Sequence, residues 1–167
     1  MQLYFKDRLF SAGITEILNE QEQQVGKIDL KSAFTSAIDV YGADGRMLCK
    51  GRFPFFSNRW EVCDADERQL GVLRVRFSFL SKKFTYEAEG RGRYDLVGSF
   101  MSREYAIHDE SGTELAHFRQ VNGMFSSGAF RLDHTSTKLD SYELVAVIMG
   151  MYAIQKRQSS AANAGTI

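Results

Sequence analysis

The sequence lacks several features that would narrow its class at once. Its 167 residues include one proline, Pro54, and two cysteines, Cys49 and Cys63, which lie neither in a CxxC pair nor near a histidine at ligand spacing. This argues against a disulfide framework and a zinc site, and we expect two reduced, packed thiols. Lysine plus arginine and aspartate plus glutamate both number 21. Without net charge, binding to nucleic acid or an acidic membrane requires a local patch.

The ends of the sequence carry no targeting signal that we recognise. Residues 1–8 lack the apolar core of a signal peptide, Gln2 is incompatible with myristoylation, and the C-terminus has no prenylation box. We therefore expect a cytoplasmic protein. The length predicts one domain, in which a single core can bury roughly 70% of the unfolded surface.

An uncharged and largely apolar run of eleven residues extends from Leu144 to Ile154. Asp140 and Glu143 precede it as a helix-start signal, and Lys156 and Arg157 follow where a helix end favours cations, so we predict a helix. Eleven consecutive residues leave this helix no polar face, which means that it must be enclosed. A membrane span needs about 20 apolar residues, and eleven rise only about 16 Å. We expect a core helix surrounded by its own chain.

An internal repeat organises the rest of the chain. Three copies align without gaps at two offsets of 45 residues, and three weaker copies accompany them: residues 17–26, 62–71 and 107–116, then 40–48, 84–92 and 130–137. Each unit places an alternating strand before a polar Asp, Asn or Gly reversal and a second strand after it. Six such hairpins predict about twelve strands.

Two features could mislead this interpretation. Thr15 to Gln24 is rich in helix formers, but the repeat register assigns Ile17 to a strand and Asn19 to a turn, and propensity is a weak prior. A period near 45 is also typical of propeller blades, which have no place for an apolar terminal helix. A closed β-barrel can accommodate such a helix, because eleven-stranded barrels are known to enclose a central helix. We predict a mainly β fold, a closed antiparallel barrel of about twelve strands that encloses the helix, over residues 1–157, with a disordered tail over residues 158–167.

The repeats and the terminal helix resemble the LURP-one-related family, whose fold is the tubby C-terminal type shared with phospholipid scramblases. The resemblance covers Leu3 to Arg157 and rests on a repeated aromatic-x-aliphatic-x-Asp-x-x-Gly-x-x-Leu hairpin, clearest in Tyr105 to Leu115, and on the uncharged C-terminal helix. It implies a twelve-stranded barrel threaded by a hydrophobic helix. Tubby-type domains are associated with phosphoinositide binding through a Lys-x-Arg pair, and residues 50–52 have that spacing. The proline-rich arm and cysteine cluster of scramblases are missing, which argues against calcium-dependent lipid movement.

Basic residues on the return strands are the candidates for anion or lipid binding. The repeat register puts Arg52, Arg74 and Arg119 at equivalent points on the face opposite the apolar residues, where arginine could hold phosphate through its bidentate fork. The candidate set is Lys50, Arg52, Arg74, Arg76, Lys82 and Lys83. A solvated barrel exterior with scattered charges is the competing interpretation.

Acidic residues at the reversals could offer oxygen ligands to a metal. Asp64, Asp66, Glu67, Asp109 and Glu110 lack the EF-hand spacing, however, and Asn or Gly replaces them in other copies. Turn chemistry explains them better, and we predict no metal or cofactor.

Catalysis and nucleic-acid binding have weaker support. His108, His117 and His134 could serve a hydrolase, but no nucleophile elbow, phosphate loop or HExxH motif is present. The basic and aromatic tetrapeptide at residues 91–94 is more simply a glycine-rich turn. Our leading hypothesis is a non-enzymatic cytoplasmic binding module, peripheral at the membrane, that engages an anionic lipid headgroup or another small anion. A structural or protein-interaction barrel and a hydrolase are the alternatives.

Overall fold

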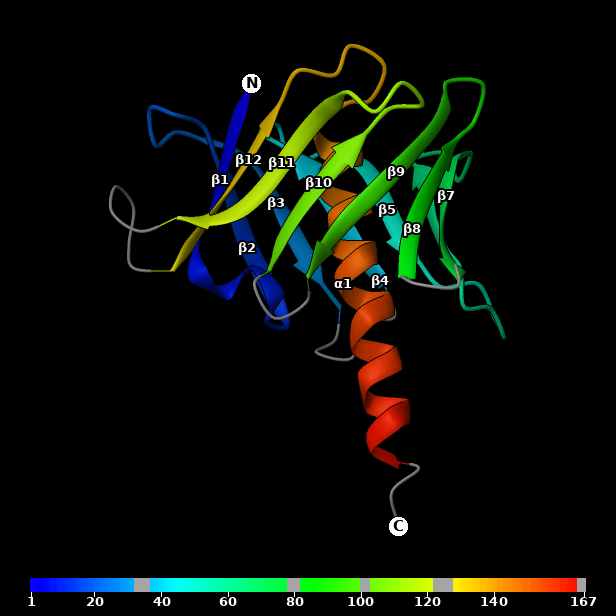
Figure 1. Cartoon of the computed structure of the whole chain (residues 1–167). Helices are drawn as coiled ribbons and strands as arrows, with labels where there is room; N and C mark the ends of the chain where they lie inside the picture. The colour runs from blue at the N-terminus through cyan, green and yellow to red at the C-terminus, as the bar shows by residue number, and fades with distance from the viewer. Residues whose placement is uncertain (32–36, 78–81, 100–102, 122–127, 165–167) are drawn as a thin grey trace.

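The described residues form twelve β-strands, a short 3-10 helix and one α-helix (Figure 1). The structure, a computed structural model, describes residues 1–31, 37–77, 82–99, 103–121 and 128–164. The elements in chain order are β1 Gln2–Phe5, η1 Asp7–Phe10, β2 Gly13–Leu18, β3 Gln24–Leu30, β4 Ala37–Gly42, β5 Met47–Arg52, β6 Trp60–Asp64, β7 Gln69–Phe77, β8 Lys82–Ala88, β9 Gly92–Ser99, β10 Glu104–His108, β11 Glu114–Val121, β12 Ala129–His134 and α1 Ser141–Ala164.

The strands make a closed antiparallel barrel in which each strand pairs with its predecessor in the chain. β1 closes the barrel against β12, with Gln2 opposite Asp133 and Phe5 opposite Phe130. The predicted barrel is confirmed, but the sixth repeat copy differs from the prediction. It contributes only β12, and the chain then enters α1 instead of a return strand. Closure explains this, because β1 already occupies the free edge of β12.

The hairpin turns repeat one hydrogen-bond pattern. In the three strongest copies, a side-chain oxygen accepts hydrogen bonds of 2.9 Å from the backbone N–H groups two and four residues further on; the acceptors are Asn19, Asp64 and Asp109. A register shift follows Ile17 and, at the equivalent point, Val62. The turn interpretation of Asp64 and Asp109 is therefore confirmed, and their oxygens hold the local backbone.

α1 lies inside the barrel for its first half, as predicted. Every residue from Leu144 to Ile154 is buried, and Tyr152, at 6% exposure, is the most accessible of the hydrophobic ones. Figure 1 shows α1 running through the barrel and its C-terminal part projecting beyond one end, which we call the exit rim. No helix in the described ranges combines the length and the apolar character that crossing a bilayer demands.

Two glycines make the slot that holds Trp60 against α1. A Cβ added to Gly51 or Gly150 would overlap the indole ring of Trp60. With both positions free of side chains, Trp60 packs close against the helix and donates a hydrogen bond of 3.1 Å from Nε1 to the carbonyl oxygen of Ala146. The two cysteines are buried free thiols, in agreement with the expectation from their spacing.

The helix is longer than the sequence predicted. We expected it to end at Arg157 and residues 158–167 to be disordered, whereas α1 continues to Ala164. Extending a helix that is already formed and packed requires no new nucleation, and the added residues include good helix formers such as Gln158 and Ala161. Residues 165–167 lie outside the described part of the chain. This extension carries the helix past the exit rim.

Candidate functional site

The candidate basic residues lie on the outer faces of β5, β7 and β8. On β5, Lys50 and Arg52 both pair with Glu67 of the β6–β7 turn, Arg52 through Nη1 at 3.0 Å. On β7, Arg74 and Arg76 share Glu87 of β8, at 3.9 and 3.2 Å. These four cations thus form two pairs, and the two members of each pair share one carboxylate.

The two remaining candidates lie on β8. Lys83 is exposed and faces Arg76 across the β7–β8 pair. The side chain of Lys82 lies outside the described residues. Because β6 separates β5 from β7, the candidates occupy one broad charged face in two ion-paired groups rather than one open groove. Such exposed pairs contribute about 0–1 kcal/mol each to stability.

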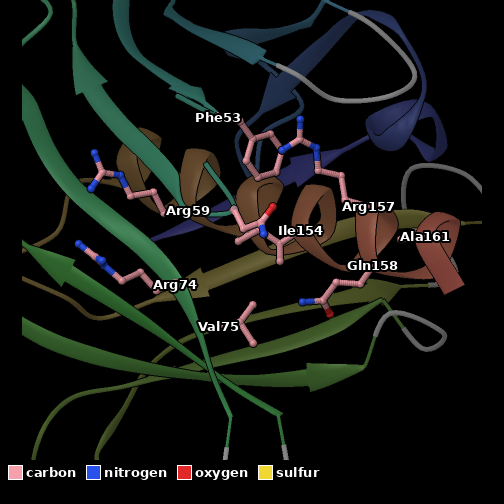
Figure 2. Close-up of a pocket in the computed structure, with 9 residues that line it drawn as sticks. Phe53, Arg59, Arg74, Val75, Ile154, Arg157, Gln158 and Ala161 are labelled. Atoms are coloured by element: carbon pink, nitrogen blue, oxygen red, sulfur yellow. The ribbon is translucent and has the colours of Figure 1, made fainter. Parts of the chain in front are cut away.

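Arg74 of this set also lines a pocket, at the exit rim between β7, the β5–β6 loop and α1. We call this cavity of about 360 Å³ the rim pocket. Figure 2 shows Arg59 and Arg74 on one side of it and Arg157 folded over Phe53 on the other. The lining residues are Phe53, Asn58, Arg59, Arg74, Val75, Ile154, Arg157, Gln158 and Ala161.

The rim pocket has three arginines but fewer carboxylates to neutralise them. Arg59 pairs with Glu61 at 2.9 Å, and Arg74 approaches Glu87 only to 3.9 Å. The guanidinium of Arg157 lies 3.8 Å from the ring centroid of Phe53, and its Nη1 donates to the carbonyl oxygen of Ser57 at 3.3 Å. Among the described residues, no carboxylate forms an ion pair with Arg157. Its remaining N–H donors are available to an anion.

The remaining lining makes the rim pocket amphipathic. Phe53, Val75 and Ile154 supply apolar walls, while Asn58 and Gln158 add amide groups. An arginine fork can bind a phosphate or carboxylate with two parallel hydrogen bonds, and apolar walls accept a hydrocarbon part of the same ligand. The lining residues that the structure describes include no carboxylate, histidine, serine or cysteine, so these residues offer neither a general base nor a nucleophile. The arrangement is suited to holding an anion.

The three histidines lie away from the rim pocket. His108 and His117 lie beside Glu114, and His117 Nε2 is 2.9 Å from Glu104. His134 Nε2 is 2.8 Å from Ser141 Oγ, the geometry of a nucleophile and base pair. Ser141 is buried, however, and His134 Nδ1 has no hydrogen-bond partner within the described residues. The third member that would orient a catalytic histidine is therefore missing there.

The tetrapeptide at residues 91–94 has a structural role that its sequence did not reveal. Arg91 binds the carboxylate of Glu143 with two hydrogen bonds, of 2.6 and 2.9 Å, and donates to the carbonyl oxygen of Leu70 at 2.7 Å. Its guanidinium is thereby committed to the start of α1. Within the described residues, no group of three or more His, Cys, Asp or Glu side chains could hold a metal ion.

Sequence reasoning missed Arg59 and Arg157 as site residues. Arg157 was interpreted only as a favourable charge at a helix end, and Arg59 lies outside the repeat copies. The one available signal was the lone proline, because Pro54 interrupts the repeat between two strands and is surrounded by Phe53, Phe55 and Phe56. Nothing in a linear pattern connects that loop with the far end of the terminal helix.

Comparisons with known proteins agree with this architecture. A sequence model of the family described as LURP-one-related matches residues 1–154. Among solved structures, the chain is similar to the X-ray structure of a protein from Arabidopsis thaliana, with a TM-score of 0.60 and 13% identity, covering 90% of this chain and 89% of the other. At that identity the likeness shows the fold alone. No curated protein matches the sequence.

Proposed function

The chain belongs to the LURP-one-related family, and on that premise we propose that it is a non-enzymatic module that binds an anionic lipid headgroup in the rim pocket. The observation that carries the proposal is that Arg59, Arg74 and Arg157 all line one amphipathic cavity. A phosphate group matches the guanidinium forks, and the glycerol and first methylenes of a lipid match the apolar walls. The proposal includes a cytoplasmic location at the membrane surface.

The rim pocket supports this function better than the ion-paired face of β5, β7 and β8. On that face Glu67 and Glu87 each bridge two cations, so an anion would have to compete with an existing partner. In the rim pocket, the contacts of the Arg157 guanidinium with described residues are with an aromatic ring and a carbonyl oxygen. An incoming anion therefore gains a charge-assisted contact without breaking an ion pair of Arg157.

The test is binding to vesicles and to a soluble phosphate ester by the same variants. We expect the protein to sediment with phosphatidylcholine vesicles that contain phosphatidylserine, less with phosphatidylcholine alone, and less as salt is raised. We also expect it to bind glycerophosphate weakly. Arg59→Gln/Arg157→Gln should lower both affinities by about tenfold or more, since each charge-assisted hydrogen bond contributes about 1.5–3 kcal/mol.

The matched control changes two arginines at the opposite end of the barrel. Arg46 and Arg68 lie in hairpin turns with side chains 85% and 79% exposed, so Arg46→Gln/Arg68→Gln removes the same charge away from the rim pocket. We expect this control to bind as the unmodified protein does. An equal loss in both double variants would show attraction by bulk charge and contradict a specific site. If the protein bound neither the vesicles nor glycerophosphate, the protein-interaction alternative would be favoured.

A further inference from the structure

The loop between β5 and β6 exposes two adjacent phenylalanines at the exit rim. Phe55 is 89% exposed and Phe56 is 96% exposed, the highest values among the large hydrophobic residues described. Their ring centroids are 4.2 Å apart. Two neighbouring aromatic rings that contact each other and little else leave a continuous apolar surface in water, which commonly marks a site of interaction.

The backbone of this loop holds both rings outward. Ser57 donates a backbone hydrogen bond of 3.1 Å to the carbonyl oxygen of Pro54, which puts Phe55 and Phe56 at the two central positions of a tight turn. Phe56 has φ of 56°, in the left-handed region that bulky residues rarely adopt. Glycine or asparagine would fit that position without strain. A phenylalanine there, with its side chain in solvent, indicates a requirement for the ring.

The loop is attached firmly to the rim pocket on both sides. Phe53 packs edge-on against Trp60, with centroids 5.0 Å apart, and so anchors the start of the loop to the buried core. On the other side, Arg157 lies over Phe53 and donates to Ser57. These contacts fix the exposed rings relative to the guanidinium groups, with the apolar rings at the loop tip and the cations at its base.

This arrangement fits the interface of an anionic bilayer. Phosphates lie at the level where cations are needed, and hydrocarbon lies just below them, where phenylalanine rings gain by leaving water. Neither the two phenylalanine rings nor the arginines would attach the protein strongly to a membrane alone. The rings offer a small apolar surface, and the arginines are partly exposed. Together they form the two-part anchor that peripheral binding requires.

We infer that Phe55 and Phe56 insert into the acyl region of an anionic lipid bilayer while Arg59 and Arg157 contact its headgroups, so that the barrel docks through the β5–β6 loop, on one side of the projecting end of α1. The inference rests on the proposed headgroup binding and adds the orientation and the inserting residues. The loop tip must then enter the lipid, whereas the hairpin turns at the opposite end remain in water.

A tryptophan reporter tests the orientation directly. Phe55→Trp places an indole at the loop tip, and Trp60, the one native tryptophan, is fully buried and gives a constant background. With phosphatidylserine-containing vesicles we expect a blue shift of emission and quenching by lipids brominated on their acyl chains. The control is Leu48→Trp, at a partly exposed position near the turn at the other end of the barrel, for which we expect neither change.

A loss-of-insertion variant separates this inference from headgroup binding. Phe55→Ser/Phe56→Asn removes both rings and puts at residue 56 a side chain that tolerates positive φ, so the fold should be unchanged. We expect vesicle partitioning to fall by about tenfold or more and the affinity for glycerophosphate to stay the same. Unchanged vesicle partitioning together with an unshifted Phe55→Trp spectrum would overturn insertion while leaving anion binding intact. Loss of glycerophosphate binding in Arg59→Gln/Arg157→Gln tests the rim pocket independently.

Discussion

The two ends of α1 treat their charged residues in opposite ways. At the start, the carboxylate of Glu143 is 3% exposed and receives hydrogen bonds from Tyr86 at 2.5 Å and from both terminal nitrogens of Arg91. At the exit rim, Arg157 lies against an aromatic ring and one carbonyl oxygen beside a cavity of about 360 Å³. The first arrangement satisfies its charges within the protein, and the second leaves hydrogen-bonding capacity for a ligand.

The difference follows from burial. Glu143 is surrounded by protein, where an unpaired charge is costly, so the fold must supply its partners. Burial, reinforced by the neighbouring carboxylate, raises the pKa of Tyr86 far above its ordinary value, and the phenol therefore remains a hydrogen-bond donor. Arg157 is exposed and needs no internal partner. The start of α1 therefore serves stability, and the exit rim is the place where we propose binding.

The largest expected effect comes from a charge inside the barrel. Val147 is 1% exposed, and Val147→Asp would bury a carboxylate without a partner, at a cost of several kcal/mol. A domain of this size has about 5–15 kcal/mol of total stability. We expect no cooperative unfolding transition by circular dichroism. A folded, soluble Val147→Asp protein would mean that the helix is not enclosed.

A smaller but still large loss is expected at the start of α1. Glu143→Gln keeps the shape but removes the charge that Arg91 and Tyr86 bind, and breaking a buried ion pair costs about 3–5 kcal/mol. We expect urea unfolding to show a loss toward the lower value, since Arg91 is partly exposed. Binding of glycerophosphate should not change at urea concentrations where the variant is folded. A change in that affinity would contradict the separation of roles.

An intermediate loss is expected from the slot for Trp60. Gly51→Ala places a methyl group in the indole ring, and overpacking of this kind costs about 1–3 kcal/mol. Gly42→Ala is the matched control, because its Cβ would approach Leu48 only to 3.1 Å. Thermal unfolding should show the larger decrease for Gly51→Ala. Equal decreases would imply that Trp60 can move away.

The smallest effect on stability is expected at the exit rim. Arg157→Gln removes an exposed cation–π contact, which contributes about 0.5–1 kcal/mol. Chemical unfolding should therefore differ little from the unmodified protein, while glycerophosphate binding falls. A loss of several kcal/mol would show that Arg157 is a structural residue and would remove the contrast between the two ends of α1.

Predictions from the sequence were most successful where a single local pattern was sufficient. The alternation in β4, with Ile38 and Val40 buried between partly exposed neighbours, follows directly from the period of a strand. Asn19 and Asp109 could be recognised as turn residues because their hydrogen bonds reach only four residues along the chain. The candidate cations were less predictable. Lys50 and Arg76 are bound by carboxylates that only the strand register brings to them.

The sequence by itself determined that this chain forms hairpins around an enclosed helix, because alternation, turn chemistry and the missing polar face are local properties. Tertiary structure alone decided which strand closes the barrel, how far α1 continues past the rim, and which arginines line the same pocket. Arg59 of the β5–β6 loop, Arg74 of β7 and Arg157 of α1 are separated along the chain, and barrel closure together with the path of the helix places them around one pocket. Long-range packing therefore determines the candidate site, and short-range patterns determine the strands, turns and helix around which it is built.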